Sequence, residues 1–287
     1  TEAAIEALRE ADEILSGQRS AETPAMLSRV GRRQRRVLYE WLVEMLAGEN
    51  RSGEALVAAE KGRALRIVDL LAGQEIGASA AGRELLRREA ELSEAIRALR
   101  QKLLHESGAV PDAELLERLA GAEGDYRDLL VRLGEEDGKL LALVSPPSFD
   151  PLALQRLLGE DTTLFEYFCT PGRLYVWAVH GERIQLGALD LDRGALRNLV
   201  QAFLAAVRDK NKRKTESLAR QAYDRLLKPV IPFVSGERIV FVPDDCLVYF
   251  PFAALNYRGR VLAEGFSISS LPRAGLYEPP GGAQALR

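Results

Sequence analysis

The feature that most constrains the fold of this chain is a change of sequence periodicity halfway along it. From Thr1 to about Asp137, apolar residues recur at three- and four-residue spacing and the breaks fall at Gly or Pro, a pattern typical of helices. The segment VSPPSFDP, residues 144–151, then brings three prolines, and aromatic and β-branched residues become frequent beyond it. Because proline disfavours helix in the residue before it, we expect a domain boundary between a helical part and an α/β part.

The helical part is expected to begin with a short helix over residues 1–15, followed by one helix-turn-helix unit with its turn near Gly48 to Gly53. In the second helix of the unit, small residues would let a neighbouring helix approach closely, while larger apolar residues form a buried stripe. The small residues are Ala55, Ala58, Ala59 and Gly62, and the stripe is Leu56, Leu65, Val68 and Leu71. Stacked repeats need several units for stability, so residues 1–75 are interpreted as the end of a longer repeat array.

A second helical pair, an antiparallel hairpin, is expected over residues 82–137. Gly108 to Pro111 would make its turn, with Pro111 and Asp112 suited to begin the second helix. Each helix carries one apolar seam at three- and four-residue spacing, which predicts coiled-coil-like packing. The seams are Leu85, Leu92, Ile96, Leu99 and Leu103 on the first helix, and Leu115, Leu119, Tyr126, Leu129 and Leu133 on the second.

The α/β part is expected over residues 150–287. It begins with a short helix over 151–158, and strands over 162–170, 173–180 and 183–191 then follow as an antiparallel meander. Helices over 193–209 and 215–227 come next, separated by the basic stretch KNKRK. The continuous apolar run IVFV, residues 239–242, is typical of a strand buried on both faces, which favours a central position in the sheet.

Composition and charge narrow the functional classes. Lys and Arg number 39 against 42 Asp and Glu, so the basic excess usual in nucleic-acid-binding proteins is missing. The run Arg32 to Arg36 is interpreted as a solvated helix face. Two cysteines do not make a disulfide framework in a chain of this length. With no signal-like N-terminus and no long apolar run, we expect a cytoplasmic protein without nucleic-acid or membrane partners.

The histidines and cysteines do not form an evident catalytic pair. His105 lies near a helix end at the hairpin tip, and His180 is expected in a strand-to-strand turn. Cys169 and Cys246 are interpreted as strand residues, because buried cysteine behaves as a small hydrophobe. A pairing of Cys169 with His180 across the first hairpin would need an unusual register. Cysteine catalysis within these residues is therefore not expected.

Other catalytic and cofactor signatures are also missing from the sequence. It contains no Walker loop, dinucleotide fingerprint or spaced Cys/His metal set, so we expect no cofactor and no metal. Asp244 and Asp245 could be considered as an acid/base pair. Adjacent residues at a strand end point to opposite sides, however, and a turn role suffices for both.

Four segments occur in the order TTLFEYFCTPGRLYVWAVHGERI, ARQAYDRLLKPVIPFV, ERIVFVPDDCLVYFPFAALNY and LAEGFSISSLPRA. In this order they resemble the opening portion of a CHAT domain, a caspase-like and separase-related cysteine peptidase. The third segment matches the family pattern most specifically, with its one departure at Cys246, near the family's turn glycine. Matching residues to which the resemblance assigns structural roles are Glu166, Tyr167, Tyr223, Pro229, Pro243, Asp244, Pro251, Phe252 and Pro272.

The helical part is similar to what precedes CHAT domains. AEKGRALRIVDLL, residues 59–71, resembles the last tetratricopeptide-like repeat before the domain, and a charged helical hairpin is also usual there. In the family, the catalytic His and Cys lie downstream of the segment matched by Pro272. The His180-Gly181 pair precedes the PDD and PFAAL segments, so its order excludes that role.

The resemblance thus implies that this chain is the non-catalytic N-terminal part of such an endopeptidase. It would support a catalytic half carried by a missing segment or a second chain, and it would bind a regulator or substrate protein through its helices. Arg287, in a Pro/Gly-rich context, is a candidate processing site. The alternative reading is an inactive interaction scaffold with a degenerate CHAT-like domain.

Overall fold

The computed structural model describes residues 2–19, 29–72, 79–105, 113–136, 149–181 and 183–279. The chain forms two compact units. The first comprises Thr1–Trp41 and Lys61–Ser148, and the second comprises Leu42–Glu60 and Phe149–Arg287. The second unit therefore includes the tip of a helical hairpin that lies far from the rest of it in sequence. The domain boundaries expected from the sequence stay a prediction.

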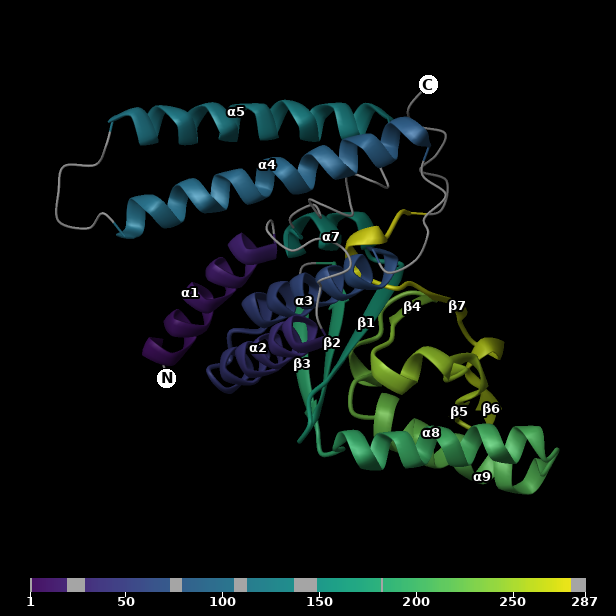
Figure 1. The fold of residues 1–287 in the computed structure, drawn as a ribbon. Coiled ribbons are helices and arrows are strands. Elements are labelled where there is room, and N and C mark those ends of the chain that lie inside the picture. Colours follow the sequence, from purple (N-terminus) through teal and green to yellow (C-terminus); the bar gives the residue numbers. More distant parts are fainter. Residues whose placement is uncertain are drawn as a thin grey trace. The chain divides into compact units, whose positions relative to one another are not determined.

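Among the described residues, five helices precede the α/β region, as the sequence periodicity predicts (Figure 1). They are α1 (Glu2–Arg19), α2 (Arg29–Gly48), α3 (Ser52–Ala72), α4 (Ala80–His105) and α5 (Ala113–Glu136). The turn between α2 and α3 falls where Gly48 and Gly53 indicate it, while α1 continues four residues past the expected end at Leu15. Leu65, Val68 and Leu71 lie in α3, but their side chains are outside the described ones.

In the first unit, α1, α2 and α3 are joined by hydrogen bonds at Asp12 and by a close approach between α2 and α3 at Gly62. Asp12 of α1 accepts hydrogen bonds from the Tyr39 hydroxyl of α2 and the Lys61 ammonium of α3. Gly62 lies against the Tyr39 ring so closely that a Cβ at this position would be 2.8 Å from Tyr39 Cγ. The expected close approach of a helix at Gly62 is therefore confirmed.

Helices α4 and α5 form the expected antiparallel hairpin and lie side by side (Figure 1). All ten predicted seam residues are buried or half-buried, with Leu133 and Leu129 the most deeply buried. At one end the Ser79 hydroxyl accepts from the Gly82 amide at 2.9 Å and donates to Glu136 at 2.6 Å. This serine caps α4 and joins it to the end of α5.

The second unit is built on a mixed five-stranded sheet in the order β3-β2-β1-β4-β7. Its strands are β1 (Thr162–Cys169), β2 (Leu174–His180), β3 (Arg183–Leu189), β4 (Arg238–Val242) and β7 (Ser267–Ser270). The first three form the predicted antiparallel meander, whereas β1, β4 and β7 are mutually parallel. The expected central position of the IVFV run is confirmed, because β4 lies between β1 and β7.

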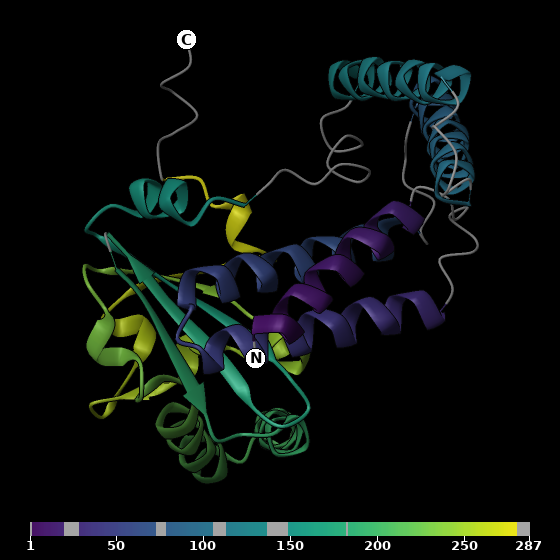
Figure 2. The same cartoon turned by 90° about the vertical axis from the view of Figure 1, so that its left-hand side faces the viewer.

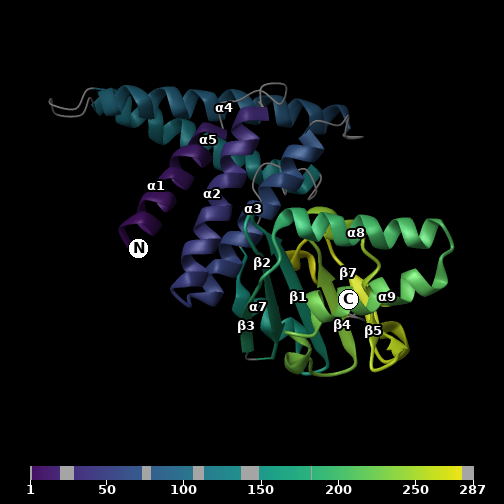
Figure 3. The same cartoon turned by 90° about the horizontal axis from the view of Figure 1, so that it is seen from below.

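Helix α7 (Pro151–Leu158) precedes β1, with Asp150 accepting from the Leu152 amide at 2.9 Å as its N-cap. Helices α8 (Arg193–Arg208) and α9 (Lys212–Ala222) pack antiparallel (Figure 3), and a π-helical turn, Tyr223–Leu227, continues α9. The expected start of the second of these helices at Thr215 is wrong. It begins inside the basic stretch because the Asn211 side chain accepts from the Lys214 amide at 3.0 Å and caps it.

The two faces of the sheet are covered by different elements. One face packs against α8 and α9 (Figure 2) through an aromatic cluster in which Phe241 and Phe252 stack with ring centroids 4.2 Å apart. On the other face, Trp177 of β2 is fully buried and its Nε1 donates to the Ser52 carbonyl at 2.9 Å. Ser52 begins α3, so the hairpin tip over Leu42–Glu60 belongs to the cover of this second face.

Short elements flank β4 in the chain, the first of them before the strand and the others after it. These are the 3-10 turns Ile231–Phe233, Asp245–Tyr249, Phe252–Ala254, Leu262–Glu264 and Ala274–Leu276, and the two-stranded pair β5 (Asn256–Tyr257) and β6 (Arg260–Val261). Cys246 lies in the second of these turns, so its expected strand placement is wrong. The turn forms there because the sheet hydrogen bonds of β4 end at Val242 and Pro243 has no amide hydrogen to donate.

The close approach at Gly62 generates a stability prediction. We expect Gly62→Ala to lower the free energy of unfolding by about 1 to 3 kcal/mol, because the added methyl overlaps the Tyr39 Cβ and Cγ atoms. The matched control is Gly121→Ala in α5, where no atom lies within 4 Å of the added Cβ. It should stabilise by about 0.5 to 1 kcal/mol through helix propensity. Urea unfolding measures both, and equal effects of the two variants would contradict the packing argument.

Candidate functional site at the carboxyl edge of the sheet

The candidate site lies where parallel strands β1 and β4 end, at Cys169 and Val242. Open α/β sheets bind ligands at the carboxyl ends of their parallel strands, since chain segments diverge there. Pro243, Asp244 and Asp245 follow β4 directly at this edge. The PDD motif therefore occupies the part of the sheet where a site is expected.

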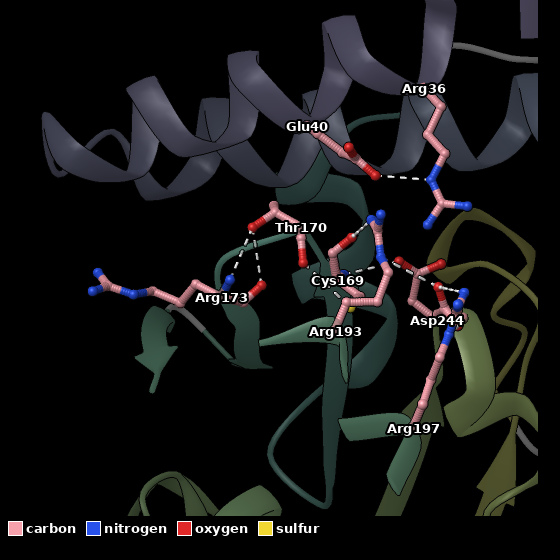
Figure 4. A network of polar contacts seen from close by, with 9 residues as sticks. Arg36, Glu40, Cys169, Thr170, Arg173, Arg193, Arg197 and Asp244 are labelled. Carbon is pink, nitrogen blue, oxygen red and sulfur yellow. Dashed lines mark hydrogen bonds and ion pairs between the residues drawn. The ribbon is translucent and has the colours of Figure 1, made fainter. Parts of the chain in front are cut away.

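Asp244 joins the ends of the two parallel strands. Its side chain is buried, and Oδ2 accepts a hydrogen bond from the Cys169 amide at 2.9 Å. Figure 4 shows Asp244 and Cys169 facing each other across the edge. A buried carboxylate needs hydrogen-bond donors, so Asp244 acts as a side-chain substitute for the sheet hydrogen bonds that end with β1.

Asp245 is held by two arginines of α8. Arg197 donates through Nε at 3.1 Å and through Nη2 at 3.0 Å to the two carboxylate oxygens, and Arg193 Nε lies 3.4 Å from Oδ2. Arg193 also donates through Nη2 to the Cys169 carbonyl at 2.8 Å (Figure 4). Two arginines and two carboxylates therefore balance in charge around the end of β1. Arg36 and Glu40, drawn in the same figure, form an ion pair within α2.

Asp245 has φ of 49°, in the left-handed region that only Gly, Asn and Asp adopt readily. The resemblance described above predicts a turn glycine near Cys246. The structure places the left-handed residue one position earlier, at Asp245. The paired arginines stabilise the carboxylate of this residue.

The thiols at this edge are not prepared for nucleophilic attack. Cys169 is buried at the end of β1, and burial raises the pKa of its thiol to about 11. Burial also raises the pKa of the half-buried Cys246 thiol. The thiolate is the nucleophilic form, so both cysteines favour a packing role.

The register of β1 and β2 separates Cys169 from His180. Cys169 pairs with Leu174 at one end of β2, and His180 is the last residue of β2 at the other end, opposite Arg183. Six residues of extended strand correspond to about 20 Å, which confirms that these side chains do not pair. His180 ends the strand that was expected over residues 173–180, next to the turn, and its backbone still belongs to the β2–β3 ladder. His105 ends α4, as expected.

The residues that the family resemblance singles out are spread over the second unit rather than gathered into one cleft. Tyr167 and Phe252 meet in the core with ring centroids 5.4 Å apart, and the Tyr167 hydroxyl donates to the Leu226 carbonyl at 3.1 Å. Glu166 lies buried on the opposite face of β1. The remaining members are the half-buried Tyr223 and Pro243 and the exposed Pro229, Pro251 and Pro272. Arg287 lies outside the described residues.

Sequence reasoning missed both arginines of the network. Arg193 and Arg197 are four residues apart, which places them on one face of the helix that begins at Arg193. That spacing is visible in the sequence. Their partner Asp245 is 48 residues away from Arg197, and only the folded sheet shows that the pair meets it.

Within the described ranges, no group of three or more His, Cys, Asp or Glu residues is arranged to hold a metal ion. Among the same residues, no helix combines the length and apolar character needed to cross a membrane. Neither known protein-family descriptions nor curated proteins yield a match to this chain.

The strand-end bond of Asp244 generates a second prediction. We expect Asp244→Ala to lower the free energy of unfolding by about 2 to 3 kcal/mol, because the buried Cys169 amide then loses a charged acceptor. Glu216→Ala is the control, since Glu216 is exposed on α9 and surface changes of this kind stay within about 0.5 kcal/mol. Chemical unfolding compares the two, and a loss no larger than that of the control would show that the bond is dispensable.

A third prediction concerns the buried thiol. Since the pKa of Cys169 rises from 9.0 to about 11 on folding, the unfolded chain loses this proton first as the pH increases. The stability contribution is complete below about pH 9 and is lost as the pH rises through about 11. The measurement is the difference in unfolding free energy between the native chain and Cys169→Ala over this range. A difference independent of pH would contradict the assigned shift.

Proposed function

We propose that this chain is the non-catalytic N-terminal part of a CHAT-family, caspase-like cysteine endopeptidase. In this role it supports the catalytic half and links it to a helical protein-binding region. The observation that carries the proposal is that all four segments of the family resemblance contribute to one sheet and its core. They supply β1, β2 and the start of β3, then the end of α9 with its π-helical turn, β4 with the PDD turn, and β7, in the family's order.

The chemistry at the carboxyl edge also favours a non-catalytic role for this chain. A cysteine peptidase requires a thiolate with a histidine base within reach. Cys169 is buried with a raised thiol pKa, and its sequence-near histidine lies at the far end of β2. Asp244 and Asp245 are engaged by an amide and by two arginines. The described residues thus stabilise the edge and leave the attack on a peptide bond to the downstream His and Cys.

Strand β7 provides the edge at which the catalytic half would join. It pairs with β4 on one side, and within the described residues the sheet order ends with it. Three of its four residues, all serines, are exposed. An unpaired strand edge presents backbone donors and acceptors to a further strand. In the proposed protein, the sequence that follows β7 adds the next strands and brings the catalytic His and Cys to the same carboxyl edge.

The proposal is tested on the full-length protein with an irreversible cysteine-peptidase probe. We expect labelling of a cysteine downstream of the β7 segment, and loss of labelling when that cysteine is replaced by Ala. Cys169→Ser and Cys246→Ser are matched controls and should leave labelling unchanged, because neither thiol is the nucleophile. Intact masses of all polypeptides in the preparation show whether the catalytic half is attached or separate, and whether cleavage occurs after Arg287.

The alternative function is an inactive scaffold that binds a regulator through its helices. Its specific support is Trp41, which is 56% exposed on α2, an unusual exposure for a residue enriched at protein interfaces. The same probe experiment separates the two functions. Labelling that depends on the downstream cysteine excludes the scaffold, whereas full-length protein without any labelled cysteine overturns the peptidase proposal.

A further inference from the structure

A fully buried carboxylate of α3 holds the chain as it leaves β7. Glu60 is 0% exposed, and it accepts three hydrogen bonds from consecutive residues: from Arg273 Nε at 3.2 Å, from the Ala274 amide at 2.9 Å and from the Gly275 amide at 3.0 Å. We name these four residues the Glu60 clamp. All of them lie in the second compact unit.

The clamp fixes a turn rather than a single side chain. Two of its donors are backbone amides of the 3-10 turn Ala274–Leu276, and Arg273 is itself buried. A Cβ at Gly275 would lie 2.8 Å from Arg273 Nη2, so glycine allows the guanidinium to lie against the backbone. Beyond the turn, the Tyr277 hydroxyl reaches Thr162 of β1 at 3.5 Å. The segment after β7 is thereby held from two elements.

Charge makes the donors of the clamp important for this attachment. A buried carboxylate is tolerated only while its donors stay in place, since an uncompensated buried charge is strongly unfavourable. The hydrogen bonds to Glu60 therefore stabilise the position of the turn against α3.

We propose that Glu60 is a positioning residue for the catalytic half, because it holds the segment that follows β7. The inference rests on the proposed function in one respect, that this segment leads to the catalytic His and Cys. Glu60 contacts no substrate in this role.

The first test is independent of peptidase activity. In Glu60→Gln we expect the amides of Ala274 and Gly275 to exchange hydrogen at least about tenfold faster, because their charged acceptor is lost. The amide of Val240 in the centre of β4 should keep its rate. Glu54→Gln is the control, since Glu54 lies on the same helix and forms an exposed ion pair with Arg51. Unchanged exchange at Ala274 and Gly275, or equal acceleration at Val240, overturns the clamp.

The second test measures peptidase turnover of full-length protein. Glu60→Gln should lower kcat about tenfold or more with little change in KM, whereas Glu54→Gln should leave both unchanged. Gly275→Ala displaces Arg273 without removing a charge, and it should show the same kcat loss if Glu60→Gln fails to fold. Faster exchange at Ala274 and Gly275 with unchanged kcat overturns the positioning role of Glu60. Full-length wild-type protein without turnover overturns the proposed function, while the exchange test still decides whether the clamp exists.

Discussion

The α/β part depends on how the ends of β1 and β4 are tied together at Asp244. The two strands are parallel and neighbouring, but the chain must leave both at the same edge, where ladder hydrogen bonds cease. The buried Asp244 carboxylate replaces the missing ladder partner by accepting from the Cys169 amide. This bond joins the two strand ends next to the aromatic core, in which the rings of Phe241 and Phe252 stack. The edge is therefore stabilised before any ligand or partner arrives.

Charge balance extends this constraint to α8. Asp245 adopts a left-handed backbone conformation, and Arg193 and Arg197 offset its cost by surrounding the carboxylate. Arg193 also binds the Cys169 carbonyl, so the helix, the turn and β1 share one network. Acidic groups at a carboxyl edge can serve catalysis when they are free to exchange protons. Here they are occupied by structural partners, which agrees with the supporting role that we propose for this chain.

Most of the secondary structure could be predicted from particular residues. The Gly48 to Gly53 turn, the seam that ends at Leu133, and the central strand before Pro243 all follow from periodicity and turn chemistry. The errors occur where a side chain makes a local hydrogen bond or where a ladder ends. Asn211 caps α9 inside a basic stretch, and Cys246 lies in a 3-10 turn. Secondary-structure propensities of single residues do not predict these local hydrogen bonds, because each bond depends on a specific donor and acceptor geometry.

The sequence by itself determined the order of elements, the break near Pro146 to Pro151 and the resemblance to the opening of a CHAT domain, since all three are patterns of neighbouring residues. Only the tertiary structure decided which distant residues meet. Asp245 finds Arg197 across 48 residues, and Glu60 finds the turn at Ala274 across 214. The physical reason is that a buried charge must be compensated by whichever donors the folded chain brings within hydrogen-bond distance. Because these donors come from distant parts of the chain, the requirement produces no periodic pattern in the sequence.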